Sequence, residues 1–254
     1  MPGSGCQPGV SGWHRAGTGA GVDLCTVDYA IEANGLGKRY GRRWALADCT
    51  LAVPAGQVVG LVGPNGAGKT TFMELAVGLL RPTSGTIKVR QRTGFVAQGA
   101  PVYDGLSVAD HLRMGQALNT RWDAGFARRR VREAGLDPRQ QAGRLSGGQR
   151  AQLALTLAVA KRPELLILDE PVANLDPLAR REFLDSVAHA ATASGDGVTV
   201  LFSSHLIADL ERTCGYLILL AASRVRLAGT VESLLAGGQS LDDLVVSCLR
   251  EAAR

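Results

Sequence analysis

The chain of 254 residues is long enough to bury a sizeable core in one large domain or two small ones. It is 46% hydrophobic and only 20% charged, a composition that excludes disorder along most of its length. Glycine, proline or charge interrupts every long apolar run, so no segment reaches the roughly 18 apolar residues of a membrane-spanning helix.

The net charge of +5 is concentrated in one segment of the chain. Residues 121–150 hold eight arginines against three acidic residues, and the remainder of the chain is neutral. A nucleic-acid-binding surface usually spreads its basic charge among aromatic side chains. This segment contains only Trp122 and Phe126 as aromatics, so direct nucleic-acid binding is not expected.

The cysteines and the N-terminus indicate the compartment. The five cysteines are scattered and lack CxxC spacing, which favours free thiols in a reducing compartment over a disulfide framework or a zinc site. They are Cys6, Cys25, Cys49, Cys214 and Cys248. The N-terminus lacks a cationic stretch followed by an apolar one, so a secretory signal is not expected.

The first part of the chain is expected to contain an extension, strands and one helix. Residues 1–27 are rich in glycine without hydrophobic periodicity, which indicates a disordered extension. From 28 to 62, apolar runs broken by Asn-Gly, Tyr-Gly and Pro-Ala-Gly predict strands and turns, with the last strand at 57–62. Apolar residues at helical spacing predict a helix over 69–80 that ends before Pro82.

The rest of the chain alternates between strands and helices. The further predicted strands are 86–89, 94–97, 165–168, 198–202, 216–220 and 225–227. The further predicted helices are 107–118, 124–134, 147–161, 177–193, 205–213, 230–235 and 241–251. Such alternation predicts an α/β fold with a largely parallel sheet that is covered on both faces.

A glycine-rich loop between a predicted strand and a predicted helix fits the phosphate-binding pattern G-x4-G-K-[ST]. Its residues are Gly63, Pro64, Asn65, Gly66, Ala67, Gly68, Lys69 and Thr70, with Thr71 as a further candidate at its end. The glycines let backbone N–H groups turn inward around phosphates, and the start of the helix favours the same anion. Lys69 is expected to reach the β- and γ-phosphates, and Thr70 to ligate Mg²⁺.

A pair of carboxylates follows a continuous apolar run at 165–168, which is typical of a strand buried on both faces. Asp169 and Glu170 therefore lie at the carboxyl edge of the predicted sheet, where open α/β folds bind ligands. Asp169 suits the binding of Mg²⁺ through water. Glu170 suits the orientation or polarisation of an attacking water molecule.

The segment Leu145-Ser146-Gly147-Gly148-Gln149 precedes the predicted helix 147–161. Ser146 is a good N-cap, and the glycines let a ligand approach the first turn of the helix. The sequence thus predicts a second anion-binding helix N-terminus.

Together these motifs resemble those of the ATP-binding subunits of ATP-binding cassette (ABC) transporters, over residues 28–230. GPNGAGKT resembles the family's Walker A motif, LLILDE its Walker B motif and LSGGQ its signature. The resemblance implies that Gln98 is the Q-loop glutamine that contacts Mg²⁺. It also implies that residues 174–176 form the D-loop and that His205 is the switch histidine at the γ-phosphate. Tyr40 matches the aromatic that stacks on adenine, although Trp44 is close enough to compete.

The resemblance also implies a fold and an assembly. The expected fold is a P-loop NTPase core with a mostly parallel sheet, an antiparallel β subdomain and an α-helical signature subdomain at about 99–161. This domain is expected to cover 28–236, with a short helix in 237–254. Two such subunits pair head to tail in the family and bind ATP between the Walker A motif of one and the signature of the other. Ser146, Gly147, Gly148 and Gln149 are thus expected to bind the nucleotide of the partner.

The implied activity is ATP hydrolysis that drives a separate membrane permease, from the cytoplasmic face of the membrane. The short C-terminal part and the EPVANLDP run resemble exporter-type subunits. One departure concerns the D-loop, where Ala173 stands in place of the common serine and removes a hydroxyl that reaches across the dimer. The expected cofactors are ATP and Mg²⁺, and the second subunit is either an identical or a different chain.

Two alternatives lie outside transport. A soluble ABC ATPase acting on DNA or ribosomes would carry a long coiled coil or a second cassette. Only 47 positions separate Gln98 from Leu145, without sustained heptads, and the chain has one cassette. A metabolic P-loop kinase would transfer phosphate to a small molecule and has no use for the LSGGQ segment.

The basic segment overlaps the helical subdomain that meets the permease in the family. We therefore hypothesise that Arg128, Arg129, Arg130 and Arg132 favour an acidic permease loop or anionic lipid headgroups. The alternative is a solvated helix face.

Overall fold

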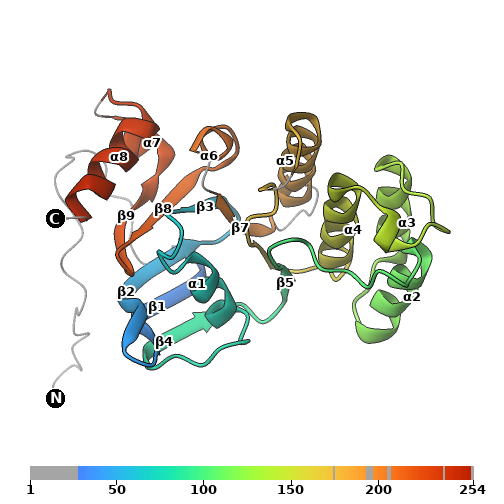
Figure 1. Ribbon diagram of the computed structural model, residues 1–254, viewed down its shortest axis with the longest axis horizontal. Coiled ribbons are helices and arrows are strands. Elements are labelled where there is room, and N and C mark those ends of the chain that lie inside the picture. Colours follow the sequence, from blue (N-terminus) through green and yellow to red (C-terminus); the bar gives the residue numbers. More distant parts are fainter. Residues whose placement is uncertain (1–27, 174, 193–196, 205–206, 237, 253–254) are drawn as a thin grey trace, which may run out of the picture.

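The computed structural model describes residues 28–173, 175–192, 197–204, 207–236 and 238–252. It contains two sheets, and a group of helices lies at one end of the molecule (Figure 1). Among the described residues, no helix is both long enough and apolar enough to span a membrane. The described cysteines, Cys49, Cys214 and Cys248, are free thiols.

The larger sheet has six strands in the order β5-β6-β7-β3-β8-β9. The strands are β3 (Val58–Val62), β5 (Thr93–Val96), β6 (Leu165–Leu168), β7 (Thr199–Ser204), β8 (Tyr216–Ala221) and β9 (Arg224–Thr230). All neighbours pair in parallel except β8 and β9, which are antiparallel. The prediction of a largely parallel sheet is confirmed, and its central strands are the apolar runs that the sequence displays.

The smaller sheet is antiparallel, with the order β2-β1-β4. Its strands are β1 (Tyr29–Tyr40), β2 (Arg43–Pro54) and β4 (Ser84–Val89). The Asn34-Gly35 pair, predicted to break the chain direction, lies inside β1 at a register shift between Ala33 and Leu36. Gly35 has a φ of +55°, so the pair forms an irregularity that bends one long strand and does not join two strands.

The helices are α1 (Lys69–Ala76), α2 (Val108–Leu118), α3 (Ala124–Glu133), α4 (Gly147–Val159), α5 (Pro177–Thr192), α6 (Ile207–Thr213), α7 (Val231–Leu235) and α8 (Leu241–Ala252). The predicted helix 69–80 ends earlier than expected, because Gly78 has a φ of +78° just beyond the C-cap at Val77. The other predicted helices agree with the structure to within about two residues at each described end.

Two cores lie on opposite faces of the larger sheet. Side chains from one face, such as Leu166, Leu168 and Phe202, pack with residues of α4, α5, α6 and α8. Side chains from the other face, such as Ile167 and Leu201, pack with α1 and with the antiparallel sheet. One cover of the larger sheet is therefore helical, and the other combines a helix with a second sheet, as the predicted fold class requires.

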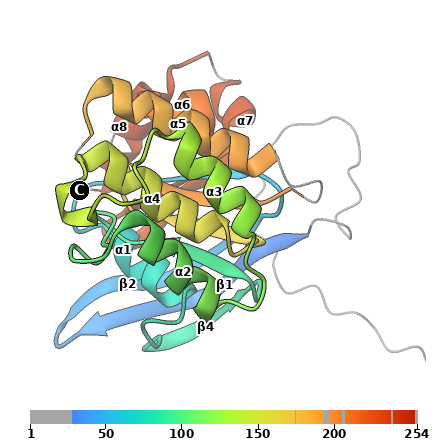
Figure 2. The same ribbon diagram turned by 90° about the vertical axis from the view of Figure 1, so that its right-hand side faces the viewer.

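The helices α2, α3 and α4 form a small layer with its own core at one end of the molecule (Figure 1). The buried residues of this core are Val108, Val131, Leu136, Ala142, Leu145 and Leu153. Figure 2 views the molecule from this end and shows these helices in front of the sheets. The signature segment is the entry into α4, so it belongs to this helical layer.

Candidate active site

The glycine-rich loop joins β3 to α1 and is packed tightly at both ends. A Cβ on Gly63 would lie 2.1 Å from the Leu220 carbonyl oxygen, so no larger residue fits there. A Cβ on Gly68 would lie 2.5 Å from the Ala45 carbonyl oxygen, and this glycine has a φ of +106°. The strands β2 and β8 thereby hold the loop in one shape. The first amide groups of α1 have no partners within the helix and are available to an anion at the loop.

Lys69 is buried at the start of α1, with 5% of its surface exposed. Its Nζ donates a hydrogen bond of 2.8 Å to the Gly63 carbonyl oxygen. The same Nζ lies 3.5 Å from Glu170 Oε1. The ammonium group therefore connects the two ends of the candidate site, the glycine-rich loop and the carboxylates after β6.

Asp169 and Glu170 are held by a third residue, Ser203, at the end of the neighbouring strand β7. The buried Ser203 hydroxyl donates to Asp169 Oδ1 over 2.8 Å and accepts the Glu170 N–H over 2.7 Å. Glu170 has a φ of +44°, which is unusual for a non-glycine residue and is common at functional sites. One hydroxyl therefore fixes both the carboxylate of Asp169 and the strained backbone of Glu170.

Ser203 was not among the predicted site residues. The sequence gives only a slight signal for it. The Ser-Ser pair at 203–204 follows an apolar run, and many strands end in polar residues in this way. Only the register of β6 against β7, which pairs Leu168 with Phe202, brings the following residues of the two strands together.

The chemistry of these groups fits a nucleotide with Mg²⁺. Mg²⁺ prefers oxygen ligands from a few carboxylates and hydroxyls together with water and substrate phosphates. Asp169 supplies a carboxylate at the carboxyl edge of the sheet, and Thr70 supplies a hydroxyl in the first turn of α1. Both residues remain predicted ligands of Mg²⁺.

The signature segment forms the start of α4 through a capping box. The Gln149 N–H donates to Ser146 Oγ over 3.2 Å, and the Ser146 N–H donates to Gln149 Oε1 over 3.0 Å. Ser146 and Gly147 are exposed, whereas Gly148 and Gln149 are partly buried. The segment therefore presents an ordered helix N-terminus to the surface, and α4 lies apart from α1 in Figure 1.

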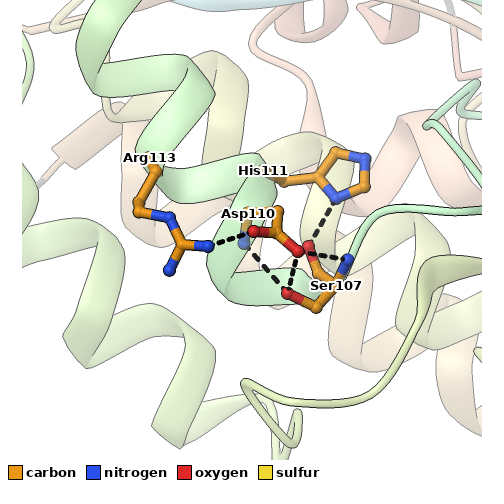
Figure 3. A network of polar contacts seen from close by, with 4 residues as sticks. All are labelled: Ser107, Asp110, His111 and Arg113. Carbon is orange, nitrogen blue, oxygen red and sulfur yellow. Dashed lines mark hydrogen bonds and ion pairs between the residues drawn. The ribbon is translucent and has the colours of Figure 1, made fainter.

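The exposed Gln98 lies in a turn after β5, and the chain then passes to the helical layer. Two contacts fix the next loop. The Tyr103 N–H donates to Nε2 of the buried His111 over 3.0 Å. His111 Nδ1 in turn donates to the Ser107 carbonyl oxygen over 2.8 Å (Figure 3). Asp104 also accepts a hydrogen bond of 2.8 Å from Arg150, on α4 just beyond the signature. The loop after Gln98 is thus joined to the signature helix.

The register of the β1–β2 hairpin separates the two candidate aromatics. Directly opposite residues share a face of a sheet, and Tyr40 pairs with Arg43 whereas Arg39 pairs with Trp44. The Arg39 guanidinium lies 5.5 Å from the Trp44 ring, which also packs on Gly37. Trp44 therefore occupies one face of the hairpin, and Tyr40, half exposed, occupies the other.

The D-loop and switch positions are only partly described. His205 and Asn174 lie outside the described residues. Asp176 accepts the N–H groups of Leu178 and Ala179, each over 3.0 Å, and so caps the start of α5. Ala173 is partly buried, and its N–H donates to the Glu170 carbonyl oxygen over 3.3 Å.

Comparisons with known proteins agree on one family. The profile of the ABC transporter family matches residues 46–173. The chain is 37% identical over 223 residues to the energy-coupling factor transporter ATP-binding protein EcfA2 of Symbiobacterium thermophilum, covering 78% of this chain and 75% of that protein. It is 34% identical over 250 residues to the daunorubicin resistance ATP-binding protein DrrA3 of Streptomyces coeruleorubidus, covering 90% of this chain and 76% of that protein.

A solved structure extends this likeness to the fold. The ATP-binding subunit of an ABC transporter superposes with a TM-score of 0.77 at 28% identity. The superposition covers 88% of this chain and 99% of that one. The two sheets and the helical layer therefore follow an arrangement already seen in an ATP-binding subunit.

Proposed function

The chain belongs to the ABC transporter family as an ATP-binding subunit with ATPase activity, and from this premise we propose how its residues carry out hydrolysis. The proposed substrate is Mg·ATP, bound by residues 63–71 and cleaved beside Asp169 and Glu170. The observation that carries the proposal is the bridge from Lys69 to Glu170 and, through Ser203, to Asp169.

The phosphate chain is bound by the loop and α1. The backbone N–H groups of 63–71 and the ammonium group of Lys69 surround the β- and γ-phosphates. Thr70, Asp169 and Gln98 are the residues that would hold Mg²⁺, which draws charge from the phosphates when bound. Phosphoryl transfer depends mainly on positioning and charge stabilisation, and the packed ends of this loop suit that requirement.

Glu170 orients the attacking water and accepts its proton. His205, which is outside the described residues, is the switch histidine that the sequence resemblance implies. The Ser203 bond holds the Glu170 backbone in its unusual conformation, so the carboxylate remains beside Lys69. A general base contributes about a hundredfold to ten-thousandfold to a rate when it is placed within reach of the proton that it accepts.

Adenine stacks on Tyr40. This assignment is supported by the hairpin register, because Tyr40 shares a face with Arg43, and Arg43 lies beside the glycine-rich loop. Trp44 lies on the opposite face, where its ring packs on Gly37.

Two ATP-binding subunits enclose the nucleotide between them. Ser146, Gly147, Gly148 and Gln149 present a capped helix N-terminus on the helical layer, apart from α1 of the same chain (Figure 1). A helix N-terminus favours a phosphate, and the partner subunit supplies the phosphate that this one binds. The partner is a second copy of this chain or a related one.

The subunit drives a permease on a separate chain, from the cytoplasmic face of the membrane, and the direction of transport is export. The resemblance of the EPVANLDP run to exporter-type subunits supports this direction. DrrA3, which is named for daunorubicin resistance, is similar over 90% of this chain. The test is co-expression with a candidate membrane permease and transport assays in inside-out vesicles. ATP-driven accumulation of a drug inside the vesicles is expected, and ATP-driven loss of a preloaded solute would contradict export.

The central experiment replaces Glu170 by Gln in the full chain. ATP turnover is expected to fall by at least about a hundredfold, because the attacking water loses the general base that accepts its proton. ATP is expected to remain bound, and a closed dimer is expected to elute earlier on size-exclusion chromatography. Glu164→Gln is the matched control, since Glu164 pairs with Arg92 at the other end of β6. Turnover that is unchanged in Glu170→Gln would reject the role of Glu170.

A further inference from the structure

The β1–β2 hairpin brings a cation against the glycine-rich loop. A Cβ placed on Gly66 would lie 3.7 Å from Arg43 Nη2. Two residues further along β2, the Ala45 carbonyl oxygen lies closer to the loop, 2.5 Å from the position of a Cβ on Gly68. The start of β2 therefore runs beside the loop, and the Arg43 guanidinium reaches Gly66.

Arg43 has no acidic partner in the part of the chain that the structure describes. The two cations of β1 near it, Lys38 and Arg39, make other contacts. Lys38 Nζ donates to the Arg81 carbonyl oxygen over 2.8 Å, and the Arg39 guanidinium lies over the Trp44 ring on the far face. Arg43 is thus an exposed guanidinium at a loop built to bind phosphate.

The charge balance of the site favours such an additional cation. Lys69 lies beside Glu170, and Asp169 precedes Glu170 in the chain, so these three side chains together carry excess negative charge. ATP carries about four negative charges near neutral pH, and one Mg²⁺ offsets two of them. A guanidinium binds phosphate oxygens through paired, charge-assisted hydrogen bonds.

We propose that Arg43 is a nucleotide-binding residue that contacts the phosphates nearest the ribose. The inference rests on the proposed function, because it requires the nucleotide to lie in the loop with its base at Tyr40. Tyr40 and Arg43 are opposite partners on one face of the hairpin. A base on Tyr40 therefore places the α- and β-phosphates, which ATP and ADP share, within the reach of Arg43.

The experiment measures ATP and ADP affinity of the full chain with fluorescent nucleotide analogues and by competition with the natural nucleotides. Arg43→Ala is expected to weaken the binding of both ATP and ADP by about fivefold to tenfold. The loss is smaller than for a buried contact, because the Arg43 side chain is exposed. Arg43→Lys is expected to recover part of the loss, because it keeps the charge without the planar fork.

Arg42 is the matched control, an exposed arginine in the turn next to Arg43. Arg42→Ala is expected to bind both nucleotides as the unchanged chain does, and thermal unfolding verifies that each variant is folded. Equal losses in Arg42→Ala and Arg43→Ala would overturn the contact in favour of general surface charge. The proposed contact would also be overturned if Arg43→Ala kept its affinity for both nucleotides, or if it lost affinity for ATP but not for ADP. Failure of the unchanged chain to bind either nucleotide would instead reject the proposed function.

Discussion

At the scale of single residues, the candidate site depends on the hydroxyl of Ser203, a residue outside the recognised motifs. Ser203 is completely buried and joins the carboxylate of Asp169 to the N–H of Glu170. A buried donor or acceptor that loses its partner costs about 1–3 kcal/mol. The left-handed backbone of Glu170 adds strain that the same bond offsets. Ser203 is therefore a positioning residue for both carboxylates.

Replacing Ser203 by Ala tests this role. The free energy of unfolding is expected to fall by about 1–3 kcal/mol, because the Glu170 N–H loses its acceptor in the interior. The kcat for ATP is expected to fall at least about tenfold, with a smaller change in KM, because the carboxylates lose their alignment while the glycine-rich loop stays intact. Steady-state ATPase kinetics and urea unfolding measure the two effects.

Thr156→Val is the control for the loss of a buried hydroxyl. Thr156 is buried in α4, and its hydroxyl donates to the Gln152 carbonyl oxygen over 2.7 Å, away from the carboxylates. This variant is expected to leave kcat close to that of the unchanged chain. A Ser203→Ala protein with unchanged kcat would show that Ser203 serves stability alone.

At the scale of elements, the start of α2 is stabilised by a polar network (Figure 3). Ser107 caps the helix, and its hydroxyl donates to Asp110 Oδ2 over 2.5 Å. The Ser107 N–H donates to the same oxygen over 3.0 Å, and Arg113 pairs with the other oxygen of the carboxylate. The hydrogen bonds from Ser107, with the charge of Arg113, lower the pKa of Asp110 below its ordinary value.

Asp110 therefore makes stability depend on pH. A carboxylate with a lowered pKa stabilises the folded state above its unfolded pKa of about 4, and this contribution is lost as the pH falls through the lowered value. Asp110→Asn is expected to be less stable than the unchanged chain near pH 7. The difference in stability is expected to shrink as the pH falls from about 5 to about 3.

Chemical unfolding across this range measures the difference at each pH. Asp185→Asn, an exposed aspartate on α5, is the control. A difference for Asp110→Asn that stays constant down to the lowest pH would show that its charge does not stabilise the cap.

The same elements connect distant motifs of the site. Asp104 follows the Gln98 turn, and its bond to Arg150 joins that segment to α4. The Arg150 guanidinium also donates to the Ala142 carbonyl oxygen over 3.2 Å, just before the signature. Gln98 and Ser146 were predicted as separate site residues, and the structure connects their segments through one arginine.

At the scale of the whole molecule, the structure shows which arginines of the basic segment are exposed. Arg128, Arg129 and Arg132 are exposed on α3. Arg130, grouped with them in the sequence hypothesis, is instead packed against α4, with 13% of its side chain exposed and a 3.1 Å hydrogen bond to Gln152. The charged face available to a permease loop or to lipid headgroups therefore consists of the three exposed arginines.

Reversing these charges tests the membrane hypothesis. The triple variant Arg128→Glu, Arg129→Glu and Arg132→Glu is expected to lose most of its low-salt association with vesicles rich in an anionic phospholipid, because each basic residue near such a surface contributes about 1 kcal/mol. Vesicle sedimentation measures the bound fraction, and association should also weaken as salt rises.

The control reverses three exposed arginines near the C-terminus, Arg212, Arg226 and Arg250. This variant has the same net charge as the triple variant on α3, and it is expected to retain more of the association. Equal loss in both variants would show that net charge alone governs binding, and unchanged association of the α3 variant would reject the hypothesis.

Local patterns in the amino-acid sequence predicted the order of the elements, the family and the segments in which we place the candidate site. Helical and strand periodicity, the glycine-rich loop, the apolar run before Asp169 and the cap at Ser146 are local patterns, so neighbouring residues alone reveal them. Only the tertiary structure brought Ser203 between Asp169 and Glu170, separated the faces of Tyr40 and Trp44, placed Arg43 at Gly66 and packed Arg130 against α4. These contacts depend on strand register and on packing between distant segments, and a shift of one residue in a strand reverses the face of every side chain.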